Sequence, residues 1–268
     1  MTGGGVRRRA WRGWLVVVAL AGAACSKSPP ATSPLPAGAG PGTGSRPEVV
    51  DSLWAEAEAD FRAGDWEDVQ LTLDRANLEM APTDPRRPRM FFLEGEALAA
   101  QGDYLQAARY FRRVSDETPG DPLAPDALLR AADAFAALWR RPELDPTYGQ
   151  TALSTYAEVT TRFPGTPAAK KAQRRTLELT DQFANKEYQT GRHYMKLKAY
   201  DSAILYFRDV VATYPRSSVA PSALASLVKA YYKLGYLEDV QETCGYIRRF
   251  HPNAPEVKGL CLDASDAS

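Results

Sequence analysis

From about residue 48 onward, glycine and proline divide the chain into units of similar length. Glycine can adopt the left-handed backbone conformation that ends a helix. It occurs in Gly64-Asp65-Trp66, Gly102-Asp103-Tyr104 and Gly235-Tyr236-Leu237. Proline follows at residues 119, 164, 215 and 252. Because the apolar residues between these points recur at helical spacing, without a convincing period-2 stretch, the pattern predicts an all-α chain of helix hairpins.

Residues inside these units also repeat. Ala107, Phe111 and Val114 in one unit correspond to Ala203, Phe207 and Val210 in another. The segment Ala124–Leu128 (APDAL) matches Ala220–Leu224 (APSAL) 96 positions later, and each starts five residues after a helix-ending proline. Pro125 and Pro221 are therefore expected in the first turn of a helix, where the missing N–H costs nothing.

We interpret residues 48–258 as a tetratricopeptide-type α-solenoid of five helix hairpins, followed by a C-terminal tail at 259–268. The approximate repeats are 48–85, 86–120, 121–165, 166–216 and 217–253. The closing prolines lie 37 to 51 residues apart, which exceeds the roughly 34 residues of an ideal unit. The expected causes are a loop at 140–150 and an extension, 168–183, of the first helix of the fourth unit. Stacked hairpins leave a concave inner face free for a ligand.

The first 24 residues have the features of a secretory signal peptide. Arg7, Arg8, Arg9 and Arg12 precede an apolar run of 11 residues, Trp14–Ala24. A retained membrane-spanning helix would need about 20 such residues. Gly22, Ala23 and Ala24 lead to Cys25 in a pattern that resembles a bacterial lipobox, with Gly22 where leucine is usual. The sequence predicts that Cys25 carries a lipid, with plain secretory cleavage nearby as the alternative.

Residues 25–47 are expected to form the lipidated cysteine and a disordered tether. The tether is almost wholly proline, glycine, alanine, serine and threonine, a composition that cannot bury enough apolar surface to offset the entropy of ordering. The glycines at 38, 40, 42 and 44 are not a phosphate-binding loop, since no strand precedes them and no lysine is in place. Ser26 follows the cysteine in place of aspartate, which in such lipoproteins implies sorting to the outer membrane.

A set of residues in the second half of the chain is more specific than the repeat pattern. It consists of Asp145-Pro146, Phe163-Pro164-Gly165-Thr166, Glu187, Gly191, Tyr194, Tyr200, Ala203, Phe207 and Tyr214-Pro215. In this combination the chain resembles the BamD family of outer-membrane β-barrel assembly lipoproteins. Five repeats, an N-terminal lipid and a proline-rich tether agree with that family, whereas the loop at 140–150 is shorter than its usual counterpart.

The resemblance implies a non-catalytic scaffold of the β-barrel assembly machinery, anchored by its lipid in the outer membrane of a diderm bacterium and facing the periplasm. The implied partners are a barrel-forming subunit of the BamA type, other assembly lipoproteins and unfolded outer-membrane proteins. In the family, the N-terminal repeats are associated with substrate recognition and the C-terminal repeats with the barrel-forming subunit. No cofactor is implied beyond the covalent N-terminal diacylglycerol and acyl lipid.

Charge separates the two ends of the predicted solenoid. Residues 51–84 contain ten acidic and two basic residues, whereas residues 162–198 contain nine basic and three acidic residues. The whole chain is formally neutral, which disfavours a nucleic-acid partner. Lys170, Lys171, Arg174 and Arg175 form one basic helical face, which fits lipid headgroups, an acidic partner or simple solubility.

Projection of the repeat phase onto the first helix of each unit predicts two surfaces. The substrate groove contains Trp54, Glu58, Phe61, Phe92 and Glu96. The partner-docking face contains Tyr188, Arg192, Lys196, Lys229, Tyr232 and Lys233. The basic face suits an acidic partner domain, because complementary fields orient docking. In the alternative interpretation, the aromatic residues pack on the next helix and the basic residues form a solvated surface.

Two cysteines and two histidines complete the list of candidates. Cys244 falls at an apolar second-helix position and Cys261 on an expected short final helix, so either a disulfide or two separate buried thiols fits. His193 and His251 have no partner at metal-ligand spacing, and no catalytic motif is found. An enzyme acting on the cell wall is therefore disfavoured. A tetratricopeptide lipoprotein for cell-envelope division or pilus assembly remains the alternative function.

Overall fold

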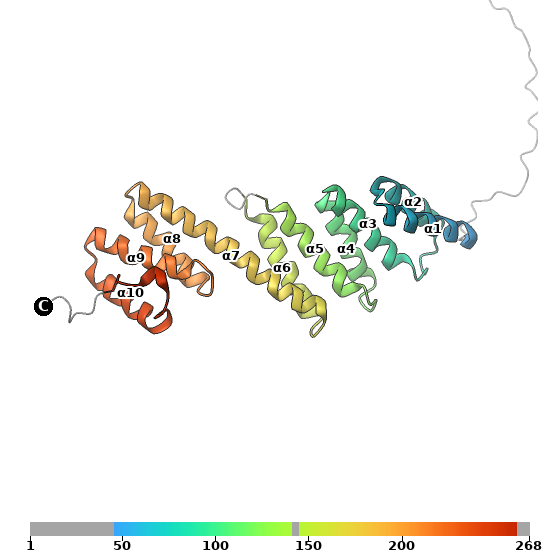
Figure 1. The fold of residues 1–268 in the computed structure, drawn as a ribbon. Helices are drawn as coiled ribbons and strands as arrows, with labels where there is room; N and C mark the ends of the chain where they lie inside the picture. The colour runs from blue at the N-terminus through green and yellow to red at the C-terminus, as the bar shows by residue number, and fades with distance from the viewer. Residues whose placement is uncertain (1–45, 141–144, 262–268) are drawn as a thin grey trace, which may run out of the picture. The chain divides into compact units, whose positions relative to one another are not determined.

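All regular structure in the described part of the chain is helical (Figure 1). The structure is a computed structural model that describes residues 46–140 and 145–261. The helices are α1 Pro47–Ala63, α2 Trp66–Glu79, α3 Arg87–Gln101, α4 Tyr104–Glu117, α5 Ala124–Leu138, α6 Thr147–Arg162, α7 Pro167–Lys196, α8 Tyr200–Thr213, α9 Ala220–Leu234, α10 Leu237–Phe250 and the 3-10 helix η1 Pro255–Val257. The signal peptide, Cys25 and almost all of the tether lie outside the described residues.

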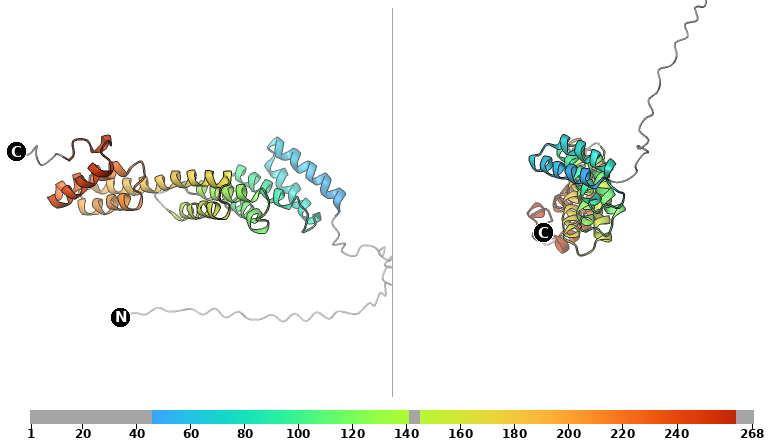
Figure 2. Two further views of the ribbon diagram at one scale, coloured as in Figure 1. Left: turned by 90° about the horizontal axis from the view of Figure 1, so that it is seen from below. Right: turned by 90° about the vertical axis from the view of Figure 1, so that its right-hand side faces the viewer.

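Each helix packs mainly on the helices directly before and after it. The α-helices thus form five consecutive hairpins, α1 with α2 through α9 with α10, and each hairpin stacks on the next (Figures 1 and 2). The apolar core is correspondingly a series of clusters along the chain. This arrangement confirms the predicted tetratricopeptide-type solenoid.

Three of the hairpins turn at the predicted glycines. Gly64, Gly102 and Gly235 have φ values of 83°, 86° and 76° and end α1, α3 and α9. The fourth hairpin turns without glycine. Lys198, between α7 and α8, adopts the left-handed conformation instead, with a φ of 59°. Its N–H donates to the carbonyl of Met195 at 3.1 Å, so the left-handed turn at Lys198 still caps the helix.

The predicted proline signals also mark helix boundaries. The residue before each closing proline is a non-helical C-cap, with φ between −125° and −135° at Thr118, Phe163, Tyr214 and His251. Pro125 and Pro221 lie in the first turns of α5 and α9, as expected. A proline at this position removes an N–H that has no partner inside the helix.

Two of the glycines at close helix contacts, Gly95 and Gly191, lie 96 residues apart, which is the interval of the internal sequence match. A Cβ atom at Gly95 would lie 2.7 Å from the ring of Phe111. A Cβ atom at Gly191 would lie 2.6 Å from the ring of Phe207. Both rings are fully buried, so they have little space into which to move. These glycines therefore allow the two helices of a hairpin to pack directly on a phenylalanine.

Helix α7 is 30 residues long and confirms the expected extension of the fourth unit. Its first half contributes Ala168, Ala172, Leu179 and Phe183 to a cluster with α5 and α6. Its second half packs on α8 and α9 through residues that include Tyr188 and Tyr194. Figures 1 and 2 show α7 running from the side of α6 to the side of α8.

A disulfide joins the end of the chain to the last hairpin. Cys244 on α10 and Cys261 are bonded, with their Cα atoms 5.5 Å apart. The prediction that Cys261 lies on a final short helix is wrong, because η1 ends at Val257 and Cys261 lies in a bend four residues later. The segment between the cysteines places Val257 in the cluster formed by α8, α9 and α10.

Candidate functional site

The structure does not bring the five predicted groove residues into one groove. Phe61 and Glu96 line a cleft of about 280 Å³ together with Trp66 and Tyr104. Phe92 lines a separate cleft of about 690 Å³ between α5 and α7. Trp54, Phe61 and Phe92 are each half-buried against the N-terminal apolar cluster. The aromatic residues therefore contribute to packing and keep only part of their surface for a ligand.

The two predicted acidic residues of this groove form ion pairs with the following repeat. Glu58 on α1 lies 3.4 Å from Arg89 on α3. Glu96 on α3 accepts two hydrogen bonds of 2.6 Å from the guanidinium of Arg130 on α5, and this arginine also lies 5.5 Å from the ring centre of Phe111. Because the carboxylates are paired, the rim of the groove is less acidic than the sequence suggested.

Arg130 is a central residue that the sequence analysis missed. It lines both clefts, between Glu96 on one side and the basic residues of α7 on the other. Its position in α5, 34 residues after Glu96, is one repeat length away. Opposite charges separated by one repeat could have indicated this contact.

The basic run at the start of α7 forms one wall of the larger cleft. Lys171, Arg174 and Arg175 line it opposite Asp126 and Asp133 of α5. Arg175 lies 3.7 Å from Asp133 and 3.0 Å from Glu178. In the described part of the chain, no carboxylate pairs with Lys171 or Arg174. The cleft thus has apolar patches, a paired acidic side and two cations available to a ligand.

The predicted docking face is largely exposed on α7 and α9. Arg192, Lys196, Lys229 and Lys233 are exposed, and 51% of the Tyr232 side chain is accessible. Tyr188 differs from the others, because its ring is half-buried 5.7 Å from that of Phe207. Arg192 lies over Tyr188 at 5.9 Å. The predicted residues are therefore four exposed cations and one exposed tyrosine on two helices, while the ring of Tyr188 packs near Phe207.

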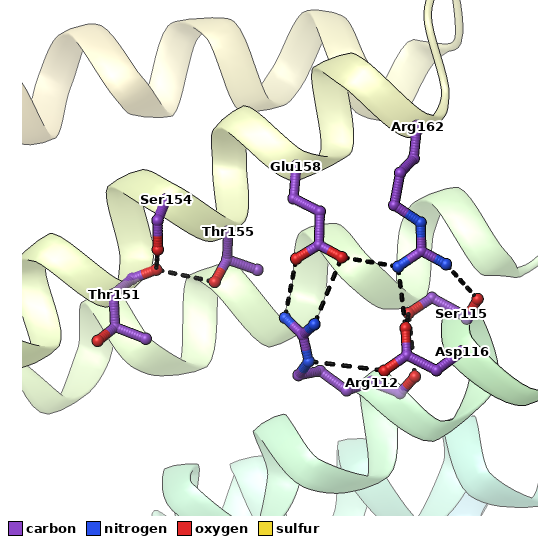
Figure 3. A network of polar contacts seen from close by, with 8 residues as sticks. All are labelled: Arg112, Ser115, Asp116, Thr151, Ser154, Thr155, Glu158 and Arg162. Atoms are coloured by element: carbon purple, nitrogen blue, oxygen red, sulfur yellow. Dashed lines mark hydrogen bonds and ion pairs between the residues drawn. The ribbon is translucent and has the colours of Figure 1, made fainter.

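A polar network joins the second helices of two successive hairpins (Figure 3). Arg162 on α6 lies 2.9 Å from Asp116 on α4 and 2.7 Å from Glu158. Glu158 in turn lies 3.0 Å from Arg112 on α4, and the Arg162 guanidinium donates to the Ser115 carbonyl. These contacts connect α4 to α6, which are separated in sequence by α5. The sequence analysis did not predict them.

The sequence profile of an outer membrane lipoprotein family, YfiO, matches residues 48–245, which is most of the chain. The chain belongs to this family. The predicted resemblance to BamD is confirmed, since the curated relatives include the outer membrane protein assembly factor BamD of Caulobacter vibrioides. The two are 29% identical over 192 residues, which are 72% of this chain and 63% of that protein.

A second relative is the outer membrane protein assembly factor BamD of Neisseria meningitidis. It is 30% identical over 111 residues, which are 41% of this chain and 42% of that protein. The chain thus spans less than two thirds of the length of these two relatives. Among solved structures, the TPR2AB domain of yeast Sti1 in its pHSP90 complex covers 78% of this chain and 80% of that chain, with 13% identity and a TM-score of 0.41.

The two histidines of this YfiO-family protein lie beside aromatic rings, and the described residues contain no metal-binding cluster. His193 is exposed beside the ring of Tyr194, and His251 lies near the ring of Tyr246. In residues 46–140 and 145–261, no cluster of histidine, cysteine or acidic residues could hold a metal ion. Among the same residues, no helix has both the length and the apolar character to cross a membrane.

A buried glutamate in the N-terminal half was also missed by the sequence analysis. Glu94 on α3 is 3% exposed. Burial raises its pKa to about 7, Asp74 adds to this rise, and a hydrogen bond from Tyr110 and the charge of Arg113 oppose it. Burial and the same glutamate raise the pKa of Tyr110 to about 12. Glu94 lies on α3 next to Gly95, at the close contact with α4.

Replacement of Glu94 by glutamine should remove a pH dependence of stability. Because the carboxyl binds its proton more tightly in the folded chain, the free energy of unfolding falls as pH rises from about 4.5 to about 7 and is level above that. The neutral variant should be more stable above pH 7 by up to about 3 kcal/mol. Urea unfolding at pH 5 and pH 8 measures this, with Glu67→Gln on exposed α2 as the control. Equal pH slopes for wild type and Glu94→Gln would contradict the assignment.

Proposed function

We propose that this protein is a non-catalytic scaffold for outer-membrane protein assembly. The observation that carries the proposal is the match of the YfiO family to residues 48–245, together with relatives that bear the name outer membrane protein assembly factor. A solenoid of stacked hairpins suits this role, because it offers extended surfaces without the need for a reaction centre. The proposed substrates are unfolded outer-membrane proteins.

The N-terminal clefts are the proposed substrate site. Exposed parts of Phe61 and Phe92 provide apolar contact area, and the two clefts meet at Arg130. Lys171 and Arg174 add positive charge on the α7 side. An unfolded chain with alternating apolar and polar residues can place apolar side chains in such clefts while its backbone and acidic groups contact the rim. The Glu96–Arg130 pair would hold the intervening helices in position.

The basic surface of α7 and α9 is the proposed docking site for the periplasmic domains of a barrel-forming subunit. Arg192, Lys196, Lys229 and Lys233 are exposed cations on these two helices, and Tyr232 on α9 is also exposed. Complementary charge on a partner would raise the association rate and orient the complex. Other assembly lipoproteins are proposed to bind the same assembly.

The proposed location is the outer membrane, with the solenoid in the periplasm. This part of the proposal rests on the predicted signal peptide, on Cys25 as the lipid-bearing residue and on the tether that follows it, together with the outer-membrane names of the relatives. The lipid is the one covalent group proposed, and no further cofactor is assigned.

Charge reversal tests the docking site. Lys229→Glu together with Lys233→Glu should reduce recovery of the barrel-forming subunit in a pull-down at physiological salt by about tenfold, because like charges then face the partner. Lys170→Glu together with Lys171→Glu makes the same charge change at the start of α7 and should leave recovery unchanged. Equal recovery of wild type and the first variant would show that this face is not the interface. Co-purification with division or pilus proteins alone would replace the assembly function.

A further inference from the structure

The second helices of neighbouring hairpins meet differently in the two halves of the solenoid: the residues between α4 and α6 differ in chemistry from those at the corresponding positions of α8 and α10. The 96-residue interval that relates α5 to α9 also relates α4 to α8, and the closing prolines relate α6 to α10 at an interval of 88. The buried residues agree with this register, since Ala152, Tyr156 and Val159 of α6 correspond to Val240, Cys244 and Ile247 of α10. Residues of the α4–α6 network can therefore be compared one by one with α8 and α10.

Three of the four charged residues of the network have no charged counterpart in the second half. Arg112 corresponds to Arg208, but Ser115 and Asp116 correspond to Val211 and Ala212, and Glu158 and Arg162 correspond to Tyr246 and Phe250. In the first half, the side chains of Arg112, Asp116, Glu158 and Arg162 and the backbone carbonyl of Ser115 connect α4 to α6 (Figure 3). In the second half, the same positions leave a groove of about 510 Å³ between α8 and α10.

The groove has an apolar floor and two helical walls. Leu224, Leu227 and Tyr231 of α9 lie beneath it at spacings of three and four residues, and each is itself no more than 6% exposed. Val211 and Ala212 belong to the wall on α8, and Tyr246 to the wall on α10. Phe250 lies beside Tyr246 with the ring centres 4.6 Å apart and the planes tilted by 42°, and it remains 55% exposed. The apolar surface accessible at the groove therefore comes from its walls, at Val211, Ala212, Tyr246 and Phe250, and such a surface group is typical of a protein-binding site.

The charges at the groove are unequal. Asp239 and Glu242 of α10 and Arg208 of α8 line it. All three act on the hydroxyl of Tyr231: burial raises its pKa first, the two carboxylates add to the rise, and Arg208 opposes it. Two carboxylates and one guanidinium line the groove, so the charged groups of its lining sum to one negative charge. In the described residues, neither Asp239 nor Glu242 has an ion-pair partner within 4 Å.

We propose that this outer groove, between α8 and α10 over α9, binds an amphipathic helix of a partner protein through an apolar stripe flanked by lysine or arginine. The floor from Leu224 to Tyr231 runs for about 10 Å along α9, which is two turns of a helix. A partner helix with apolar residues at i, i+4 and i+7 matches that length. A cation on its polar edge would lie near Asp239 and Glu242. This site is separate from the basic docking face and does not depend on it.

The most specific variant, called the restored-seam variant, introduces the polar residues of the α4–α6 network at the corresponding positions of α8 and α10. Ala212→Asp, Tyr246→Glu and Phe250→Arg, with the native Arg208, copy the four charged side chains that connect α4 to α6. Together with Val211→Ser at the neighbouring position, they should close the groove while the helices keep their contacts. Circular dichroism and thermal melting check the fold. Ala212→Arg alone, at an exposed position, is the second variant, because its long cationic side chain fills the groove and repels a cationic peptide.

The probe is a fluorescein-labelled, stapled helical peptide of about 15 residues, with leucine at i, i+4 and i+7 and flanking lysines. Fluorescence anisotropy with the purified full-length protein should show binding that weakens at least about tenfold in either variant and in a peptide with glutamate for lysine. Lys229→Glu with Lys233→Glu should bind the probe like wild type, which separates this test from the proposed docking face.

Equal affinity of wild type and both variants for the peptide would overturn the proposal. So would equal affinity of the lysine and glutamate peptides, because the groove would then not select a cation. Analytical ultracentrifugation addresses a second copy of this chain as the occupant. If wild type self-associates and the restored-seam variant is monomeric, the groove is a homodimer contact, and the proposal of a separate helical partner fails.

Discussion

Replacement of Cys244 and Cys261 by alanine is expected to lower the free energy of unfolding by about 3 kcal/mol. The bond closes a segment with a sequence separation of 17, and a cross-link of this size removes about that much conformational freedom from the unfolded chain. It also holds η1 and Val257 on the apolar end of the last hairpin. Chemical unfolding of the oxidised wild type and of the double variant measures the difference.

Two further measurements make this prediction specific. Wild type treated with a reductant should unfold at the same denaturant concentration as the double variant, because both lack the bond. Hydrogen exchange should accelerate first in residues 251–260, which are held between the cysteines. If reduction leaves both the unfolding midpoint and this exchange unchanged, the disulfide does not hold the C-terminal segment.

Replacement of Gly191 by alanine is the second change with a large expected effect, about 1–3 kcal/mol of lost stability. The added methyl group would lie 2.6 Å from the ring of Phe207, which is fully buried and so cannot move aside without displacing α8. Thermal or urea unfolding measures the loss. The equivalent change at Gly95, opposite Phe111, should act in the same direction.

Gly245→Ala is the matched control. Gly245 lies within α10, and a Cβ atom there meets no other atom within 4 Å. Alanine is a better helix former than glycine by up to about 1 kcal/mol, so this variant should gain stability. A loss of similar size at both glycines would mean that close packing on Phe207 is not the cause.

The fold was predictable because its signals are local. A left-handed glycine and a proline in the first turn of a helix act on the backbone around them, and the turns at Gly64, Gly102 and Gly235 and the starts of α5 and α9 followed from them. Lys198 was not predictable in this way, because a lysine carries no signal for the left-handed conformation that it adopts. The long α7 was predictable from its excess length.

The site was less predictable because it depends on contacts between repeats. Glu58 and Glu96 pair with arginines of the next hairpin, and repeat phase alone does not show which charges are paired. The apolar outer groove was missed for a different reason. Only a comparison of Asp116 with Ala212 and of Glu158 with Tyr246 reveals it, and this needs the helix boundaries of both halves.

Helix α7 also determines the angle at which one half of the solenoid meets the other. Its early residues, such as Phe183, pack with α5 and α6, and its later residues, such as Tyr188, pack with α8 and α9. An α-helix advances about 1.5 Å and turns about 100° per residue. The number of residues between Phe183 and Tyr188 therefore sets the rotation about the α7 axis between the surface that packs on α5 and α6 and the surface that packs on α8 and α9. One residue inserted between them would turn the second surface by about 100°, which is more than a quarter of a turn.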